Sequence, residues 1–110
     1  MAMKFMTIGY GTREDYDRMD PAVRDEAHAH DQRLRDAGAE MGIAGSPVQV
    51  RNHDNAGTEV EEGAFLRSGL PVAGFAIIEA ESVDEAIKLV ANTPCAVGHG
   101  VVEVWPLEQW

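Results

Sequence analysis

The chain has 110 residues, 45% of them hydrophobic and 25% charged, which is enough for one hydrophobic core but too little for two. Nineteen acidic and nine basic side chains give a formal net charge of −10, so the surface repels the phosphates of nucleic acids and of anionic membranes. We therefore expect one domain over residues 1–110, with no nucleic-acid partner and no membrane partner.

The single cysteine, Cys95, cannot form an internal disulfide. Neither end of the chain carries an apolar run that would indicate a signal peptide or a membrane span. Both observations favour a cytoplasmic location.

The first third of the chain predicts a strand, a loop and a helix. Residues 4–10 (KFMTIGY) predict a buried strand, and the polar stretch 11–20 predicts a loop. Asp20 followed by Pro21 is a typical helix start, because aspartate caps free amides and proline suits the first helical position. The inward stripe of a helix from Pro21 to about Ala37 is then predicted to hold Val23, Ala27, His30, Leu34 and Ala37.

The middle of the chain predicts two weaker strands. Residues 39–51 read as one bent or bulged strand, because Gly45-Ser46-Pro47 interrupts an extended segment. Residues 52–57 (NHDNAG) have the composition of a turn, and residues 58–66 predict a weak strand.

The last forty residues give the clearest pattern. Residues 72–80 predict a strand that is apolar on both faces, and residues 101–105 predict the closing strand. Between them, Ser82 and Glu85 form a capping box at the start of a helix that Thr93-Pro94 is expected to end.

The predicted order is therefore β-α-β-β-α-β, an α+β domain in which two helices cover one face of a four-stranded sheet. Large apolar side chains also occupy the other face, and burying each one is worth roughly 1.5–3 kcal/mol. Left in water, they would form a patch of a size that monomers rarely expose. We therefore expect a homodimer that packs sheet against sheet.

Several segments resemble the YCII-related (YciI-like) family, most of all its subgroup named for a DGPF motif. The opening KFMTIGYG and the helix end LRDAGAEM carry part of the resemblance. The rest lies in Val72-Ala73-Gly74-Phe75, Glu79-Ala80, Asp84-Glu85-Ala86, Pro94, Gly100, Val102-Glu103-Val104 and Pro106. The resemblance covers nearly the whole chain and implies a ferredoxin-like β-α-β-β-α-β unit that pairs into a dimeric α+β barrel.

Two positions depart from the family pattern. The naming motif falls at residues 61–65 (EEGAF), where only Gly63 and Phe65 match it. Other branches of the family have a proposed acid–base pair, a first-helix histidine and an aspartate just before the position of Pro94, but Thr93 stands here. The resemblance implies that some relatives are lyases acting on aromatic ring compounds, whereas many DGPF proteins accompany genes for extracytoplasmic-function sigma factors.

Four residues are candidates for a site. His30 is a candidate general base, because histidine side chains ordinarily exchange protons near neutral pH, and the alternative is a core histidine bonded to a backbone carbonyl. Glu62 is its candidate carboxylate partner, with Asp54 as an alternative. Arg51 could bind the carboxylate or phosphate of a ligand, or pair with nearby acids. His99 could line the same cavity as His30.

We expect no metal and no cofactor. His28 and His30 are two residues apart and so lie on opposite sides of a helix, His28 on a solvated face, and the histidine spacings match no zinc signature. No glycine-rich turn predicts a nucleotide site. Cys95 has no basic neighbour in sequence that would make it a reactive thiolate.

Three functions are compatible with these features. The favoured one is a small-molecule-binding protein that holds its ligand between helices and sheet. The second is an enzyme of the lyase or isomerase type that uses His30 as general base. The third is a regulatory protein linked to an extracytoplasmic-function sigma factor pathway.

Overall fold

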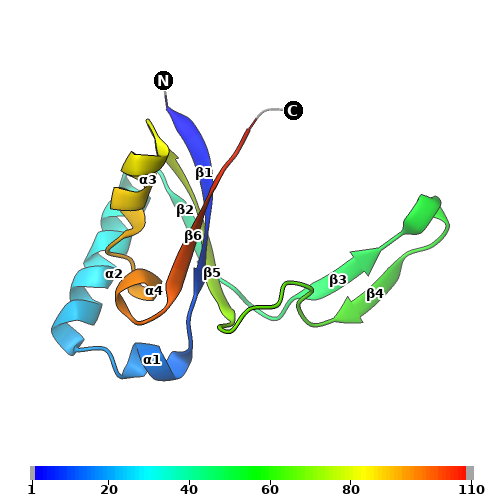
Figure 1. The fold of residues 1–110 in the computed structure, drawn as a ribbon, viewed down its shortest axis with the longest axis horizontal. Helices are drawn as coiled ribbons and strands as arrows, with labels where there is room; N and C mark the ends of the chain where they lie inside the picture. Colours follow the sequence, from blue (N-terminus) through cyan, green and yellow to red (C-terminus); the bar gives the residue numbers. More distant parts are fainter. Residues whose placement is uncertain (1, 109–110) are drawn as a thin grey trace.

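The computed structural model describes residues 2–108 and shows a mixed α+β domain with helices on one face of an antiparallel sheet (Figure 1). A separate two-stranded hairpin projects from the other side. The elements are β1 (Met3–Tyr10), α1 (Arg13–Asp17), α2 (Pro21–Asp36), β2 (Glu40–Ile43), β3 (Val48–Arg51), the 3-10 turn η1 (His53–Asn55), β4 (Glu59–Glu62), β5 (Val72–Ala80), α3 (Val83–Val90), α4 (Pro94–Val97) and β6 (Val101–Pro106).

The main sheet has the strand order β2-β5-β1-β6, and every neighbouring pair is antiparallel. The central strands β1 and β5 pair from Met3 opposite Ala80 to Tyr10 opposite Val72. These are the strands whose sequences are apolar on both faces, which suits a central position.

The hydrophobic core lies between the sheet and the helices. Phe5 of β1 and Ala86 of α3 have no exposed surface, and the remaining buried members are Ala76, Ile78, Ala80 and Val90. Helix α3 packs on β5 and β6, and α4 packs on β1 and β6. Among the described residues, no helix combines the length and the apolar character needed to cross a membrane.

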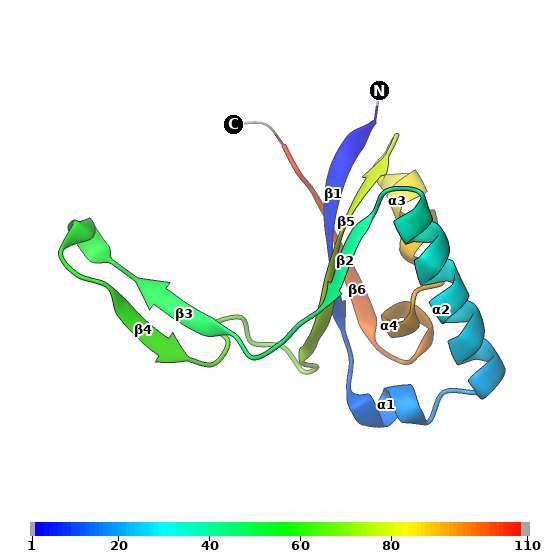
Figure 2. The same cartoon turned by 180° about the vertical axis from the view of Figure 1, so that it is seen from behind.

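The opposite face of the sheet, which we call the open face, has no helix over it (Figure 2). Side chains alternate along each strand, so Met6, Ile8, Phe75, Ile77 and Trp105 lie on the face opposite to Phe5 and Ala76. Phe75 is 46% exposed and Trp105 is 52% exposed. The open face therefore combines large apolar side chains, two of them about half exposed, with the charged residues Lys4, Glu40, Glu79 and Glu103.

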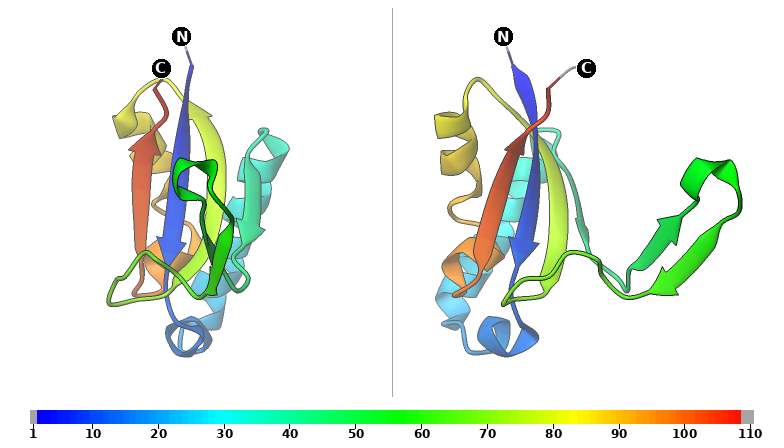
Figure 3. Two further views of the ribbon diagram at one scale, coloured as in Figure 1. Left: turned by 90° about the vertical axis from the view of Figure 1, so that its right-hand side faces the viewer. Right: turned by 45° about the vertical axis from the view of Figure 1, so that its right-hand side comes forward.

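Residues 47–65, which we call the arm, contain the hairpin of β3 and β4. The two strands pair from Val48 opposite Glu62 to Arg51 opposite Glu59. The arm leaves the sheet where β2 ends and β5 begins, and it extends away on the side of the open face (Figure 3).

The structure corrects the predicted middle of the chain. Residues 39–51 are two strands in different sheets and not one bent strand, because Gly45-Ser46-Pro47 carries the chain out of the main sheet. The weak strand predicted at residues 58–66 is confirmed only over Glu59–Glu62. The four-stranded sheet is therefore completed by β2 and β5, and the arm is an insertion between them.

The structure also corrects two helix predictions. Residues 11–20 were predicted as a loop but contain α1, whose first amides are capped where the Asp15 amide donates to Thr12 Oγ1 over 3.0 Å. Thr93-Pro94 does not end α3. That helix ends at Val90, and Pro94 occupies the first position of α4, where its missing amide costs nothing.

Candidate functional site

A cavity of about 560 Å³ opens between α2, α4 and the sheet. Most of its lining is apolar or glycine, and Leu34, Met41 and Val90 are typical members. The polar side chains that converge on it are Thr7, Thr12, Arg13, Tyr16, His28, Asp31, Arg35 and Thr93. These polar side chains come from β1, α1, α2 and the connections that precede α1 and α4, so only the folded chain brings them together.

Two glycines allow the close approaches that shape the cavity. A Cβ atom on Gly9 of β1 would lie 2.9 Å from Sγ of Cys95, so the glycine lets α4 rest directly on the strand. A Cβ atom on Gly74 of β5 would lie 2.7 Å from the carbonyl oxygen of Gly42, so β2 also approaches closely. Both glycines line the cavity.

Asp31 of α2 is the most unusual polar group in the cavity. Its Oδ1 atom is buried and has no hydrogen-bond partner among the described residues. Burial raises the pKa of this carboxyl above its ordinary value, although the charges of Arg35, His28 and His30 act in the opposite direction. The group therefore keeps its proton to a higher pH than an exposed aspartate, and a protonated carboxyl can donate a hydrogen bond.

Tyr16 and His28 tie α1 to α2 at the edge of the cavity. The Tyr16 hydroxyl lies 2.5 Å from His28 Nε2, and the two rings meet edge to face with centroids 5.8 Å apart. Arg24 places its guanidinium 5.4 Å from the centre of the Tyr16 ring. His28 was predicted to lie on a solvated face, and its exposure confirms this. The His28 side chain also lines the cavity.

Cys95 of α4 also lines the cavity. Burial raises the pKa of its thiol, and the nearby charge of Asp31 raises it further. The thiol is therefore protonated at neutral pH, which makes it a weak nucleophile and a poor metal ligand.

His30 lies beside the cavity and does not line it. Its Nε2 atom is 2.6 Å from the carbonyl oxygen of Leu89 in α3, and this bond ties α2 to α3. A ring nitrogen bonded to a carbonyl is a donor, so this is the core-histidine alternative that the sequence left open. Glu62 is exposed on β4 and Asp54 lies in η1, both on the arm and on the far side of the sheet from α2 (Figure 1). Within one chain, neither carboxylate is a partner for His30.

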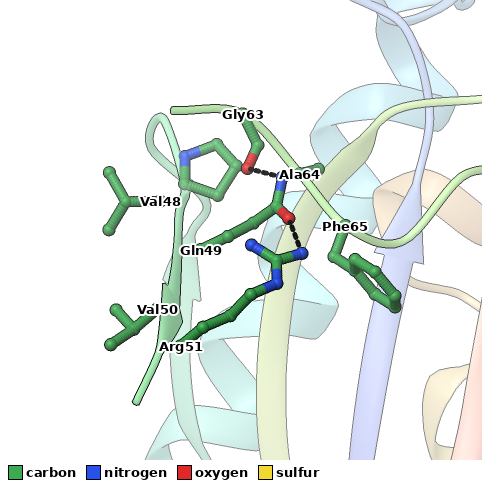
Figure 4. A pocket seen from close by; sticks show the side chains of 8 residues that line it. Val48, Gln49, Val50, Arg51, Gly63, Ala64 and Phe65 are labelled. Carbon is green, nitrogen blue, oxygen red and sulfur yellow. Dashed lines mark hydrogen bonds between the residues drawn. The ribbon is translucent and has the colours of Figure 1, made fainter. Parts of the chain in front are cut away.

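Arg51 lies on the polar side of the arm, beside a shallow hollow of about 340 Å³ (Figure 4). Its guanidinium donates to Gln49 Oε1 over 2.7 Å and to Glu61 Oε2 over 3.4 Å. It also lies 5.7 Å from the centre of the Phe65 ring. Pairing with a nearby acid is the second alternative that the sequence left open for this arginine.

His99 is exposed and has a positive φ of 66° just before β6. Its charge makes a small contribution to lowering the pKa of Asp15, which the hydrogen bond from Arg18 lowers most. His99 does not line the cavity. The four residues selected from the sequence (His30, Glu62, Arg51 and His99) are therefore not brought together in one chain.

The cavity residue Asp31 was missed because α2 turns a different stripe inward, and Tyr16 was missed because residues 11–20 were predicted as a loop and not as α1. Val23 is 42% exposed and Ala37 is exposed, whereas Ala27 and Leu34 are buried as predicted. Arg24, Ala27, Asp31 and Leu34 follow one another at steps of three and four, a spacing as regular as that of the predicted stripe. In the part of the chain that the structure describes, no group of three or more His, Cys, Asp or Glu side chains could hold a metal ion.

No protein-family model matches this chain, and no curated protein matches its sequence significantly.

Proposed function

We propose that this protein binds a small molecule in the cavity between the helices and the sheet. The observation that carries the proposal is the cavity itself, whose volume of about 560 Å³ lies within the usual range of ligand sites. Ligand sites are mostly apolar and contain a few convergent polar groups that fix orientation. The apolar lining with Asp31, Tyr16 and His28 at one wall fits that description.

Asp31 is the recognition group in this proposal. Its buried Oδ1 has no hydrogen-bond partner among the described residues, and burial raises its pKa, so the neutral carboxyl costs less free energy to form than in an exposed aspartate. A ligand oxygen that accepts a hydrogen bond from this carboxyl would remove the cost of the unsatisfied group. The ligand class that suits the cavity is therefore an apolar, compact body with at least one oxygen acceptor, such as a small aromatic acid or phenol.

An enzyme of the lyase or isomerase type is the second candidate, and the same residue favours it. A carboxyl group with a raised pKa in a cavity can exchange a proton with a bound substrate. Asp31 takes the place of His30 as the acid–base group in this version, because His30 Nε2 is already bonded to a carbonyl oxygen. Turnover of a bound compound that disappears in Asp31→Asn would favour the enzyme over a simple binding protein.

At the level of the fold, we propose a ferredoxin-like unit of the YCII-related type that forms a homodimer. The strand order β2-β5-β1-β6 supports the ferredoxin-like arrangement. The strands β1 and β2, which α2 connects, lie on either side of β5, and the strands β5 and β6, which α3 connects, lie on either side of β1. The apolar open face, with Phe75 and Trp105 about half exposed, supports the packing of two sheets into an α+β barrel.

A thermal-shift screen with benzoate, salicylate, catechol and protocatechuate tests the proposed function. We expect at least one of these compounds to raise the unfolding midpoint by about 5 °C or more at saturating concentration. Asp31→Leu should abolish the shift, and the same substitution on the exposed side of α2, Asp25→Leu, should leave it intact. The absence of any shift, or an equal shift in Asp31→Leu, would contradict the proposal.

A further inference from the structure

The arm carries an apolar face that nothing in the described chain covers. Val50 lies opposite Val60 in the hairpin, and these two side chains share a face with Val48 and with Glu62, which lies opposite Val48 at the end of that face. Val50, Val60 and Val48 are 63%, 65% and 59% exposed, respectively. We call these three valines the valine face, and Val48 and Val50 point away from Gln49, Arg51 and Phe65 (Figure 4). A two-stranded hairpin with no cover is only marginally stable in water, so the arm needs a partner.

The surface area of the chain points to a large missing contact. The chain exposes 8012 Å², whereas a compact monomer of 12.0 kDa exposes roughly 6,000 Å². Its radius of gyration is 15.9 Å, against roughly 13 Å for a compact domain of this length. The excess of about 2,000 Å² per chain is the area that each subunit of an obligate homodimer typically buries.

The arm lies on the same side of the molecule as the open face. It extends from the end of the sheet and its hairpin stands away from the sheet in one chain (Figures 1 and 3). Suppose that the arm of one subunit contacts the open face of its partner. In a two-fold symmetric dimer, the arm of the partner then contacts the open face of the first subunit in the same way. One association with an identical chain therefore covers both surfaces of both subunits.

We propose that the arm of each chain clasps a second copy of this chain, with the valine face buried against the partner subunit. The inference rests on the homodimer proposed above and adds that the arm, and not the sheet alone, forms the contact. A second copy is favoured over an unrelated protein because a single symmetric contact accounts for both the uncovered surfaces and the excess area. The contact must be mainly apolar, because each chain carries a formal charge of −10.

Amide hydrogen exchange of the wild-type protein at two chain concentrations tests the proposal without any substitution. In the dimer, we expect the amides of Val48–Arg51 and Glu59–Glu62 to be protected, and on dilution to monomer they should exchange at least about tenfold faster. The amides of β1 and β5 serve as the internal reference. A dimer whose arm amides exchange equally fast at both concentrations would overturn the clasp but leave sheet packing intact. A chain that stays monomeric at all concentrations would overturn both.

Two arm variants provide an independent test by sedimentation. Val50→Thr with Val60→Thr keeps the β-branched shape that the hairpin needs, and we expect it to raise the dimer Kd by about tenfold or more. Val50→Asp with Val60→Asp should raise the Kd by about 100-fold or more, since each site occurs twice in the dimer. As a control for added charge, Ala56→Asp with Thr58→Asp places two aspartates at the exposed turn of the same arm. Wild-type Kd values in both valine variants, with the fold verified by circular dichroism, would overturn the proposal.

Discussion

Asp31 places a carboxyl group where ionisation costs free energy. One of its oxygens is buried without a hydrogen-bond partner in residues 2–108, and the cationic groups around it offset the burial only in part. Proteins keep such a group where it serves a purpose, and a proton donor or a ligand contact in a cavity is the usual one. The unpaired oxygen is therefore the residue-scale feature on which the binding proposal depends.

The raised pKa of Asp31 predicts a specific dependence of stability on pH. Because the native carboxyl titrates above its ordinary value of 3.8, the native state binds more protons than the unfolded state in the pH range just above that value. The contribution of Asp31 to the free energy of unfolding therefore falls as pH rises through this range, and its whole penalty is present above the native pKa.

Asp31→Asn removes this ionisable group, so the variant should be more stable than the wild type at pH 7. We expect a difference of about 1 kcal/mol, at the low end for an unsatisfied group because Asp31 is only partly buried. The difference should shrink towards zero as pH falls below the ordinary carboxyl pKa. Urea denaturation between pH 3 and pH 8 would measure it, with Asp25→Asn as the exposed control on the same helix. Parallel pH profiles for wild type and Asp31→Asn would contradict the expectation.

The sequence could predict the helix that carries Asp31 but not the orientation of that helix. Val23 and Arg24 are neighbours, and hydrophobicity alone favours Val23 as the inward residue. The observed stripe contains Arg24 and Asp31, which a pattern of apolar residues cannot select because burying a charged group is normally unfavourable. The periodicity of apolar residues therefore cannot predict that a helix turns an acidic side chain towards a cavity.

At the scale of elements, the start of α3 was predictable from local sequence, whereas the partners of the middle strands were not. The serine half of the predicted capping box of α3 is confirmed, since the Glu85 amide donates to Ser82 Oγ over 3.1 Å. Glu85 Oε1 in turn accepts from the Glu81 amide over 3.4 Å. By contrast, the break at Gly45-Ser46-Pro47 has the same composition whether a strand bulges or the chain leaves the sheet. The outcome is decided by strand pairing, since β2 pairs with β5 in the main sheet and β3 pairs with β4 in the hairpin.

Removing the cap of α3 should lower the stability of the whole domain, because this helix supplies Ala86 and Val90 to the core. We expect Ser82→Ala to cost about 1 kcal/mol, which lowers the melting midpoint by about 4–8 °C in a domain of this size. Ser46→Ala, in the exposed connection before the arm, is the matched control. Calorimetry would measure both, and equal midpoints for the two variants would show that the cap contributes nothing.

At the scale of the molecule, the chain is elongated, with extents of 52, 39 and 22 Å, and it leaves two apolar surfaces uncovered. The sequence predicted one of them, because β1 and β5 are apolar on both faces. It did not predict the valine face, because the spacing of Val48, Val50 and Val60 reads equally well as part of a strand in the main sheet. We therefore infer that a second chain covers the open face and the valine face, which a single chain leaves exposed.

Sedimentation equilibrium at micromolar concentration tests this central claim most directly. We predict a folded particle with twice the 12.0 kDa mass of one chain. The association should be tighter in about 0.5 M than in about 0.05 M NaCl, because salt screens the repulsion between two chains that each carry a charge of −10. A stable, well-folded particle of 12.0 kDa under both conditions would contradict the account.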